Sequence, residues 1–241
     1  MSTPKAVWQR PEIAEAFVED RRALIPLIDG QDELVRRLIT RRERRVRRFL
    51  DLGAGGGAFA ELVMETHADA TGVLVDFSEP MAAAADRRLM GHAGRWEYVR
   101  GDLSDPGWTH SLPSGRYDLV VSAFCIHHLT DERKRALYRE AYELTEPGGM
   151  FLNWEHVAAS GLGDGMLEEW MVDRLIAAEH HHPHPRPDDE IVRDYLDAAD
   201  QDILADPFTQ CEWLREAGFQ DVEVFFQLPE IAIFGGVRRD D

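Results

Sequence analysis

A pair of glycines and a later aspartate have the types and spacing needed to bind a small charged cofactor. Gly53 and Gly55, followed by Ala58, satisfy the pattern G-x-G-x-x-G/A, in which glycines let the backbone approach a ligand closely. Asp76 follows at the end of the next apolar run, where a carboxylate can accept hydrogen bonds from ribose hydroxyls. These residues fit a pyrophosphate cofactor as well as a sulfonium cofactor.

Asp51 favours the sulfonium. It lies two residues before Gly53, inside the end of an expected strand, and a carboxylate at that point attracts a cation and repels a phosphate. Further motifs follow in a fixed order along the chain. They are Asp102-Leu103, then Asp118 to Ser122 with His127-His128, and finally Pro147-Gly148-Gly149.

Alternating strands and helices must position these motifs. The expected strands are 46–52, 70–75, 96–100, 117–123 and 150–154, and the expected helices are 12–28, 31–45, 58–67, 80–90, 130–144, two within 161–199, and 208–217. Alternation of this kind predicts a parallel, doubly wound sheet with helices on both faces. Residues 222–227 and 231–234 flank a short connection, which makes these last two strands antiparallel.

The order and spacing of the motifs resemble those of the class I S-adenosylmethionine-dependent methyltransferases, of the type that act on small molecules. The resemblance is close over residues 46–154 and extends through the terminal strand pair. It implies an α/β, Rossmann-like, doubly wound seven-stranded sheet, mostly parallel with an antiparallel last strand, plus an inserted helical cap. It also implies S-adenosyl-L-methionine as the cofactor.

The same resemblance assigns the cofactor-binding residues. Asp51 and the two glycines would meet the methionine part, Asp76 the ribose, and Asp102 with Leu103 the adenine. The full predicted set is Asp51, Gly53, Ala54, Gly55, Asp76, Phe77, Met81, Asp102, Leu103, Ser122, Ala123 and His127. The chain has Gly56 where the family often has Thr or Ser, which removes one possible hydrogen bond.

We expect four segments. Residues 1–45 form N-terminal helices that contribute to the active-site cover, and residues 46–157 form the cofactor-binding core. Residues 158–207 form a helical cap insertion, and residues 208–241 add a terminal helix and the antiparallel strand pair. The apolar lining expected from the cap is Met166, Trp170, Met171 and Tyr195, with Trp213 just beyond it.

The expected reaction moves a methyl group by in-line displacement to an O, N, S or C atom of a small-molecule acceptor under the cap. The cofactor supplies the activated carbon, while the protein supplies alignment and desolvation. His127, His128 and His156 are the candidate catalytic bases, because they follow the fourth and fifth strands at the edge where ligands bind. The His-His pair is also open to a structural or cofactor-side role.

A histidine cluster at residues 180–184 raises the question of a metal ion. Imidazole is the commonest metal ligand, but adjacent residues cannot all point at one ion. We therefore predict no metal, and keep His181 with His184, joined by His156 or Asp188, as the combination to test. The two cysteines, Cys125 and Cys211, form neither a disulfide framework nor a metal cluster.

Composition limits the partners. The formal net charge of −18 disfavours nucleic acid, and the arginines of residues 36–48 are interpreted as a solvated helix face. The chain lacks an apolar run long enough for a membrane span and an N-terminal signal core, so we expect a cytoplasmic protein. The expected partner is a small-molecule acceptor, and the expected assembly is a monomer or a homodimer.

Three rival functions stay open from the residues alone. The first is an NAD-dependent oxidoreductase, which the glycine pattern and Asp76 also fit. The second is a non-catalytic adenosylmethionine-binding protein, because in-line transfer needs no unique base. The third is a reaction that modifies the cofactor itself.

Overall fold

A computed structural model describes residues 22–41, 45–199 and 202–239 of the chain. Residues 12–21 of the expected helix 12–28 lie outside the described residues, and within 22–28 a turn separates the short helix Arg22–Leu24 from the helix that begins at Ile28. Within the described residues, a single seven-stranded sheet has the order β3-β2-β1-β4-β5-β7-β6. The predicted fold class is confirmed.

The parallel part of the sheet consists of five strands, with α-helices in three of the four connections between them. Its strands are β1 (Arg48–Leu52), β2 (Thr71–Asp76), β3 (Trp96–Arg100), β4 (Tyr117–Ala123) and β5 (Thr145–His156). The helices between them are α5 (Ala58–Thr66), α6 (Glu79–Arg88) and α7 (Asp131–Leu144). Ser78 and Thr130 cap α6 and α7, each accepting a hydrogen bond from a backbone N–H of the first turn.

The sheet ends in the predicted antiparallel pair. Strand β7 (Ile231–Val237) inserts between β5 and β6 (Gln220–Leu228) and runs antiparallel to both. Pro147-Gly148-Gly149 precedes the fifth strand as expected at 150–154, but in the structure it lies inside β5. The pairing of β4 with β5 shifts register at this point, so the glycines form an irregularity within the strand rather than its boundary.

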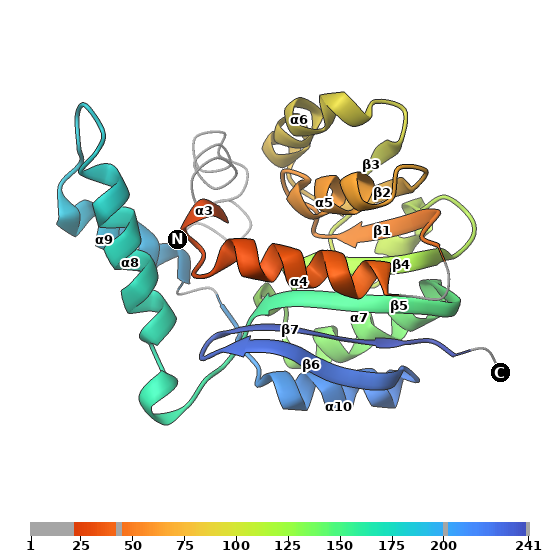
Figure 1. Cartoon of the computed structure of the whole chain (residues 1–241). Coiled ribbons are helices and arrows are strands. Elements are labelled where there is room, and N and C mark those ends of the chain that lie inside the picture. Colours follow the sequence, from red (N-terminus) through yellow and green to blue (C-terminus); the bar gives the residue numbers. More distant parts are fainter. Residues whose placement is uncertain (1–21, 42–44, 200–201, 240–241) are drawn as a thin grey trace.

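Each face of the sheet has its own apolar core. Helices α4 (Ile28–Thr40) and α5 cover one face, and α7 with α10 (Pro207–Ala217) covers the other (Figure 1). Helices α8 (Met166–Glu179) and α9 (Asp188–Ala199) stand to one side of the sheet, near the short helix α3 (Arg22–Leu24). Among the described residues, no helix is both long and apolar enough to span a bilayer.

Candidate active site

A cavity of about 250 Å³ opens at the carboxyl ends of β1, β2, β4 and β5. Loops leave these four strands side by side because the strands are parallel, and ligands bind at this edge of doubly wound sheets. The sequence predicts a site at this edge, and the structure brings most of the predicted residues to it. The lining contributed by these loops comprises Asp51, Gly53, Ala54, Gly55, Gly56, Asp76, Phe77, Ser78, Ala123, Phe124, Cys125, His127, His128 and His156.

The glycine loop after β1 needs its glycines for two reasons. Gly53, Gly55 and Gly57 have φ angles of 67°, 50° and 77°, a region that residues with a Cβ seldom adopt. A Cβ placed on Gly53 would also lie 2.0 Å from Sγ of Cys125. The loop is therefore specified by both backbone conformation and the close approach of the β4 loop.

Two carboxylates flank this loop, the buried Asp51 and the half-buried Asp76. Asp51 is buried, and its Oδ2 has no hydrogen-bond partner among the described residues. Burial, with a contribution from Asp76, raises the pKa of Asp51 to about 8. An uncompensated carboxylate in such a place fits a cationic ligand, which would supply the missing partner charge.

Asp76 holds the loops after β1 and β2 together. Its Oδ2 accepts from the backbone N–H of Gly55 at 3.0 Å, and its Oδ1 accepts from the N–H of Ser78 at 2.9 Å. Burial raises the pKa of Asp76, and these backbone bonds partly offset the rise. Each carboxylate oxygen has a second lone pair, so the side chain can still accept the two ribose hydroxyls assigned to it.

The remaining predicted cofactor residues divide into two groups. Ala54, Phe77, Met81 and Ala123 line the cavity. Three others are not part of the lining: Asp102, whose Oδ1 accepts from Ser104, Leu103, which is buried near Gly53, and Ser122, which donates to the carbonyl of Leu52 at 2.8 Å. Ser122 thus ties β4 to β1, while the adenine contacts of Asp102 and Leu103 stay a prediction.

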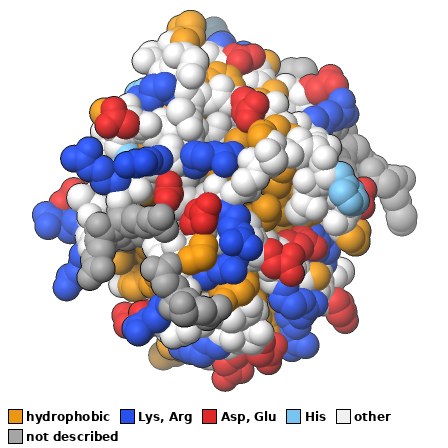
Figure 2. Space-filling view, turned by 90° about the vertical axis from the view of Figure 1, so that its right-hand side faces the viewer, with side chains coloured by type: hydrophobic (Ala, Val, Ile, Leu, Met, Phe, Trp, Pro, Cys, Tyr) orange, Lys and Arg blue, Asp and Glu red, His pale blue; other side chains and the backbone are white. Residues whose placement is uncertain are grey.

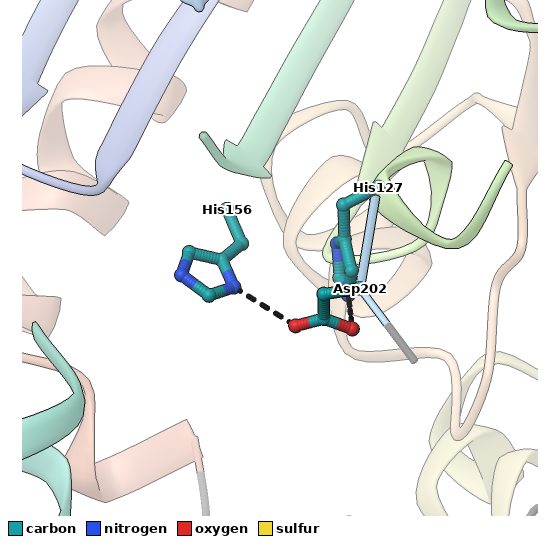
Figure 3. A group of neighbouring side chains, drawn as sticks. All are labelled: His127, His156 and Asp202. Carbon is teal, nitrogen blue, oxygen red and sulfur yellow. Dashed lines mark hydrogen bonds and ion pairs between the residues drawn. The ribbon is translucent and has the colours of Figure 1, made fainter. Parts of the chain in front are cut away.

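The three candidate histidine bases gather around one carboxylate, Asp202. Figure 3 shows two of them, His127 and His156, beside it. Nδ1 of His156 bonds to Oδ2 of Asp202 at 3.2 Å. Nδ1 of His128 and Nε2 of His127 lie 3.1 Å and 3.5 Å from Oδ1. Burial acts to raise the pKa of Asp202, but the imidazoles outweigh it and hold that pKa well below its usual range.

A second carboxylate, Glu155, orients His127. Glu155 is fully buried, and its Oε1 lies 2.5 Å from Nδ1 of His127. Its Oε2 accepts from the backbone N–H groups of Ile126 and His127. Burial acts to lower the pKa of His127, but the charge and hydrogen bond of Glu155 outweigh it and raise that pKa. Because a carboxylate only accepts, Nδ1 carries a proton toward Glu155, and the Asp202 carboxylate near Nε2 also favours the protonated ring.

Sequence reasoning missed Glu155 and Asp202 as site residues. Glu155 had a signal, since it is the next-to-last residue of β5 and directly precedes a candidate base. Asp202 had none, because it follows α9 in a segment without a motif. A backbone contact brings it to the site: the N–H of Ile203 donates to the carbonyl of His127 at 2.8 Å.

The apolar side of the cavity comes from segments outside the core. Ile25, Leu167, Met171 and Tyr195 contribute to its lining. The expectation was correct for Met171 and Tyr195 but wrong for three other residues: Met166 and Trp170 are partly exposed, and Trp213 is buried beneath the opposite face of the sheet. The face of α8 that lines the cavity therefore carries Leu167 and Met171, and not the expected Met166 and Trp170.

The histidines of the loop between α8 and α9 lie away from the cavity lining. Nδ1 of His181 faces the carbonyl of Ala177, and the N–H of His184 donates to His182. Both side chains are exposed. His156, proposed as their companion ligand, belongs to the Asp202 cluster instead.

Comparisons with known proteins agree with this geometry. Residues 49–149 match the family described as "Methyltransferase domain". A 2,7-dihydroxy-5-methyl-1-naphthoate 7-O-methyltransferase of Streptomyces carzinostaticus is 34% identical over 120 residues, 48% of this chain and 34% of that protein. A carboxy-S-adenosyl-L-methionine synthase of Wolinella succinogenes is 24% identical over 190 residues, 76% of this chain and 73% of that protein.

The fold has solved counterparts as well. An O-methyltransferase family protein from Burkholderia thailandensis superposes with a TM-score of 0.65 at 20% identity, over 95% of this chain and 60% of that one. The chain thus spans about a third of the naphthoate relative and three fifths of the solved structure. These matches decide against the NAD-dependent oxidoreductase. The comparisons support the predicted resemblance to the class I S-adenosylmethionine-dependent methyltransferases: residues 49–149 match the methyltransferase domain, and the sheet has the strand order that the resemblance implies.

Proposed function

We propose that this protein transfers a methyl group from S-adenosylmethionine to a hydroxyl oxygen of a small aromatic acceptor. The observation that carries the proposal is the convergence of His127, His128, His156 and Asp202 on the cavity that the glycine loop also lines. Acid–base groups thereby lie in the same enclosure as the residues that fit the methyl donor. A purely non-catalytic binder would have no use for them.

The cofactor half of the cavity fits the donor by charge and shape. S-adenosylmethionine supplies a methyl carbon activated by a sulfonium, and its departure leaves adenosylhomocysteine. Asp51 offers an unpaired buried carboxylate to its positive charge, and the glycine loop admits its backbone closely. Asp76 offers lone pairs to its ribose.

The histidine cluster suits an oxygen acceptor. A neutral hydroxyl is a poor nucleophile until its proton is removed, and imidazole is an effective proton acceptor near neutral pH. The lone pair of the hydroxyl oxygen forms the new bond to the methyl carbon as the carbon–sulfur bond breaks. The hydroxyl proton passes to the imidazoles grouped around Asp202 and then to water.

The acceptor class follows from the apolar lining and from the naphthoate relative. Ile25, Leu167, Met171, Phe124 and Tyr195 provide apolar and aromatic surface for a flat ring. The relative's name describes methylation of a hydroxyl on an aromatic ring. We extend that class to this chain, with residues 158–207 acting as the predicted cap and the N-terminal segment contributing Arg22 and Ile25 to the cover.

A direct assay tests the proposal. The protein is incubated with methyl-labelled S-adenosylmethionine and a panel of hydroxynaphthoates, simple phenols, anilines and thiols. We expect labelled methyl ethers from hydroxylated aromatics and equimolar adenosylhomocysteine. Transfer to nitrogen or sulfur alone would contradict the oxygen assignment.

Cofactor modification is a second candidate, because the carboxy-S-adenosylmethionine synthase aligns over 76% of this chain. The same assay separates the two functions. Mass spectrometry of the nucleoside products would show a modified adenosylmethionine in place of adenosylhomocysteine. The Asp202 cluster favours methyl transfer, since it gives an acceptor hydroxyl its proton-accepting partner.

A further inference from the structure

Three side chains from distant parts of the chain place metal-ligating atoms at one point of the cavity (Figure 3). They are His127 after β4, His156 at the end of β5, and Asp202 beyond α9. One ligand atom from each lies within 4.8 Å of the other two. We propose that His127, His156 and Asp202 form a binding site for one divalent transition-metal ion.

The spacing of the ligand atoms fits a shared ion. Bonds of about 2.1 Å from Zn²⁺ to nitrogen or oxygen place neighbouring ligand atoms about 3.0–3.4 Å apart, for angles from 90° to tetrahedral. Nδ1 of His156 lies 3.2 Å from Oδ2 of Asp202, and Nε2 of His127 lies 3.5 Å from Oδ1. The two distances join different oxygens of Asp202, and the three ligand atoms lie within 4.8 Å of one another, so an ion would draw the side chains closer together.

Asp202 has a free electron pair where the ion would sit. Its Oδ1 is buried and has no hydrogen-bond partner, although Nδ1 of His128 lies 3.1 Å and Nε2 of His127 lies 3.5 Å from it. Two nitrogen or oxygen atoms that both present lone pairs repel unless a proton or a cation lies between them. A cation between them satisfies both atoms.

Glu155 provides the outer support that metal-binding histidines commonly have. Its contact of 2.5 Å with Nδ1 of His127 keeps the proton on that nitrogen and leaves the Nε2 lone pair for the ion. A carboxylate in this position fixes the ring orientation and increases the basicity of the ligand. Glu155 is itself held by two backbone N–H groups, so this support is rigid.

Lys134 anchors the segment that bears Asp202. The Lys134 side chain is fully buried and donates to the carbonyl of Ile203 and to Asp131. The N–H of Ile203 donates to the carbonyl of His127. The third ligand is thus tied by neighbouring backbone to the first, which preorganises the site.

The donor set indicates the class of ion. Two imidazoles and one carboxylate suit Zn²⁺ or Fe²⁺ better than Mg²⁺, which prefers oxygen ligands. Three protein ligands leave open positions on the ion, as in catalytic sites. If the proposed function holds, an acceptor hydroxyl takes one of these positions and is polarised for loss of its proton, which leaves through His128 outside the ligand set.

Calorimetry with Zn²⁺ alone tests the site. Untagged protein is stripped with a chelator, desalted and titrated with Zn²⁺, and we expect one ion per chain. His156→Ala and Asp202→Asn should each weaken this binding at least 100-fold, while Glu155→Gln should weaken it about 10–100-fold. Unchanged affinity for adenosylhomocysteine shows that each variant is folded.

The exposed loop supplies the matched control. The double variant His181→Ala/His184→Ala should retain the stoichiometric ion, because neither residue lines the cavity. Loss of the ion in that variant, or its retention in His156→Ala and Asp202→Asn, would overturn the proposal.

Activity separates this site from the proposed function. If stripped protein binds no Zn²⁺ but methylates hydroxylated aromatics at full rate, the metal site is contradicted and the proposed function is retained. If Zn²⁺ binds stoichiometrically and depends on His156 and Asp202, but no hydroxyl is methylated, the metal site is supported and the proposed function is contradicted.

Discussion

The two halves of the cavity are built in different ways. The cofactor half uses consecutive pieces of chain, since Asp51, the glycine loop and Asp76 all lie within two adjacent strand–loop–helix units. The acceptor half assembles His127, His156 and Asp202 from segments far apart in the sequence. The first half depends on local backbone geometry, and the second depends on long-range packing.

This difference indicates how the two halves respond to change. Methyltransferases that share one methyl donor can bind it with the same kind of glycine loop after β1. The acceptor differs between enzymes, and a cluster supported by a separate segment can be altered without disturbing the cofactor loops. Substitutions in one half should therefore leave the binding function of the other intact.

The largest expected effect is on turnover, at His127. His127→Ala should lower kcat by about 10²–10⁴-fold, because it removes the imidazole that activates the acceptor hydroxyl. The dissociation constant for adenosylhomocysteine, measured by calorimetry, should change by much less than kcat, although His127 is also among the predicted cofactor-binding residues. Full turnover in this variant would show that the cluster is not catalytic, and His181→Ala in the exposed loop serves as the control with normal kcat.

The next effect is on folding, at Gly53. Gly53→Ala should destabilise the protein by about 2–5 kcal/mol, from the left-handed backbone and the collision with Cys125. Gly30→Ala in α4 meets no atom within 4 Å and should be neutral or stabilising by up to about 1 kcal/mol. Urea unfolding compares the two variants, and equal stabilities would contradict the role assigned to the loop.

A smaller effect is expected on donor affinity, at Asp76. Asp76→Ala should weaken adenosylhomocysteine binding by about 1–3 kcal/mol, because the ribose hydroxyls lose their acceptor. Asp86→Ala, an exposed carboxylate on the neighbouring helix α6, is the matched control. If both variants bind equally well, the ribose contact is misplaced.

The smallest expected effect is the number of protons that Asp51 releases when S-adenosylmethionine binds. Because its pKa of about 8 lies above pH 7, the side chain is mostly protonated before binding. A bound cation favours the charged carboxylate and lowers that pKa, so binding of S-adenosylmethionine at pH 7 should release close to one proton. Titrations in buffers of different ionisation enthalpy measure this release, which should vanish at pH 9 and in Asp51→Asn. Proton uptake on binding would contradict the assignment of Asp51 as the partner of the bound cation.

The same contrast explains what could be predicted from sequence. Strands 96–100 and 117–123 were predicted with the bounds the structure has, and the antiparallel pair followed from a short connection. Local patterns also located the glycine loop and the three histidines. They could not locate Asp202, whose position depends on a backbone bond between Ile203 and His127. Nor could they show which stripe of α8 faces inward, because that depends on packing.

The identity of the ligand held by the glycine loop is the central claim, and calorimetry tests it most directly. Separate titrations of the wild-type protein with adenosylhomocysteine and with NAD would distinguish a sulfonium-type site from a pyrophosphate site. We predict one adenosylhomocysteine per chain, weakened in Asp76→Ala, and no heat from NAD. Tight binding of NAD, or no binding of adenosylhomocysteine, would contradict the account.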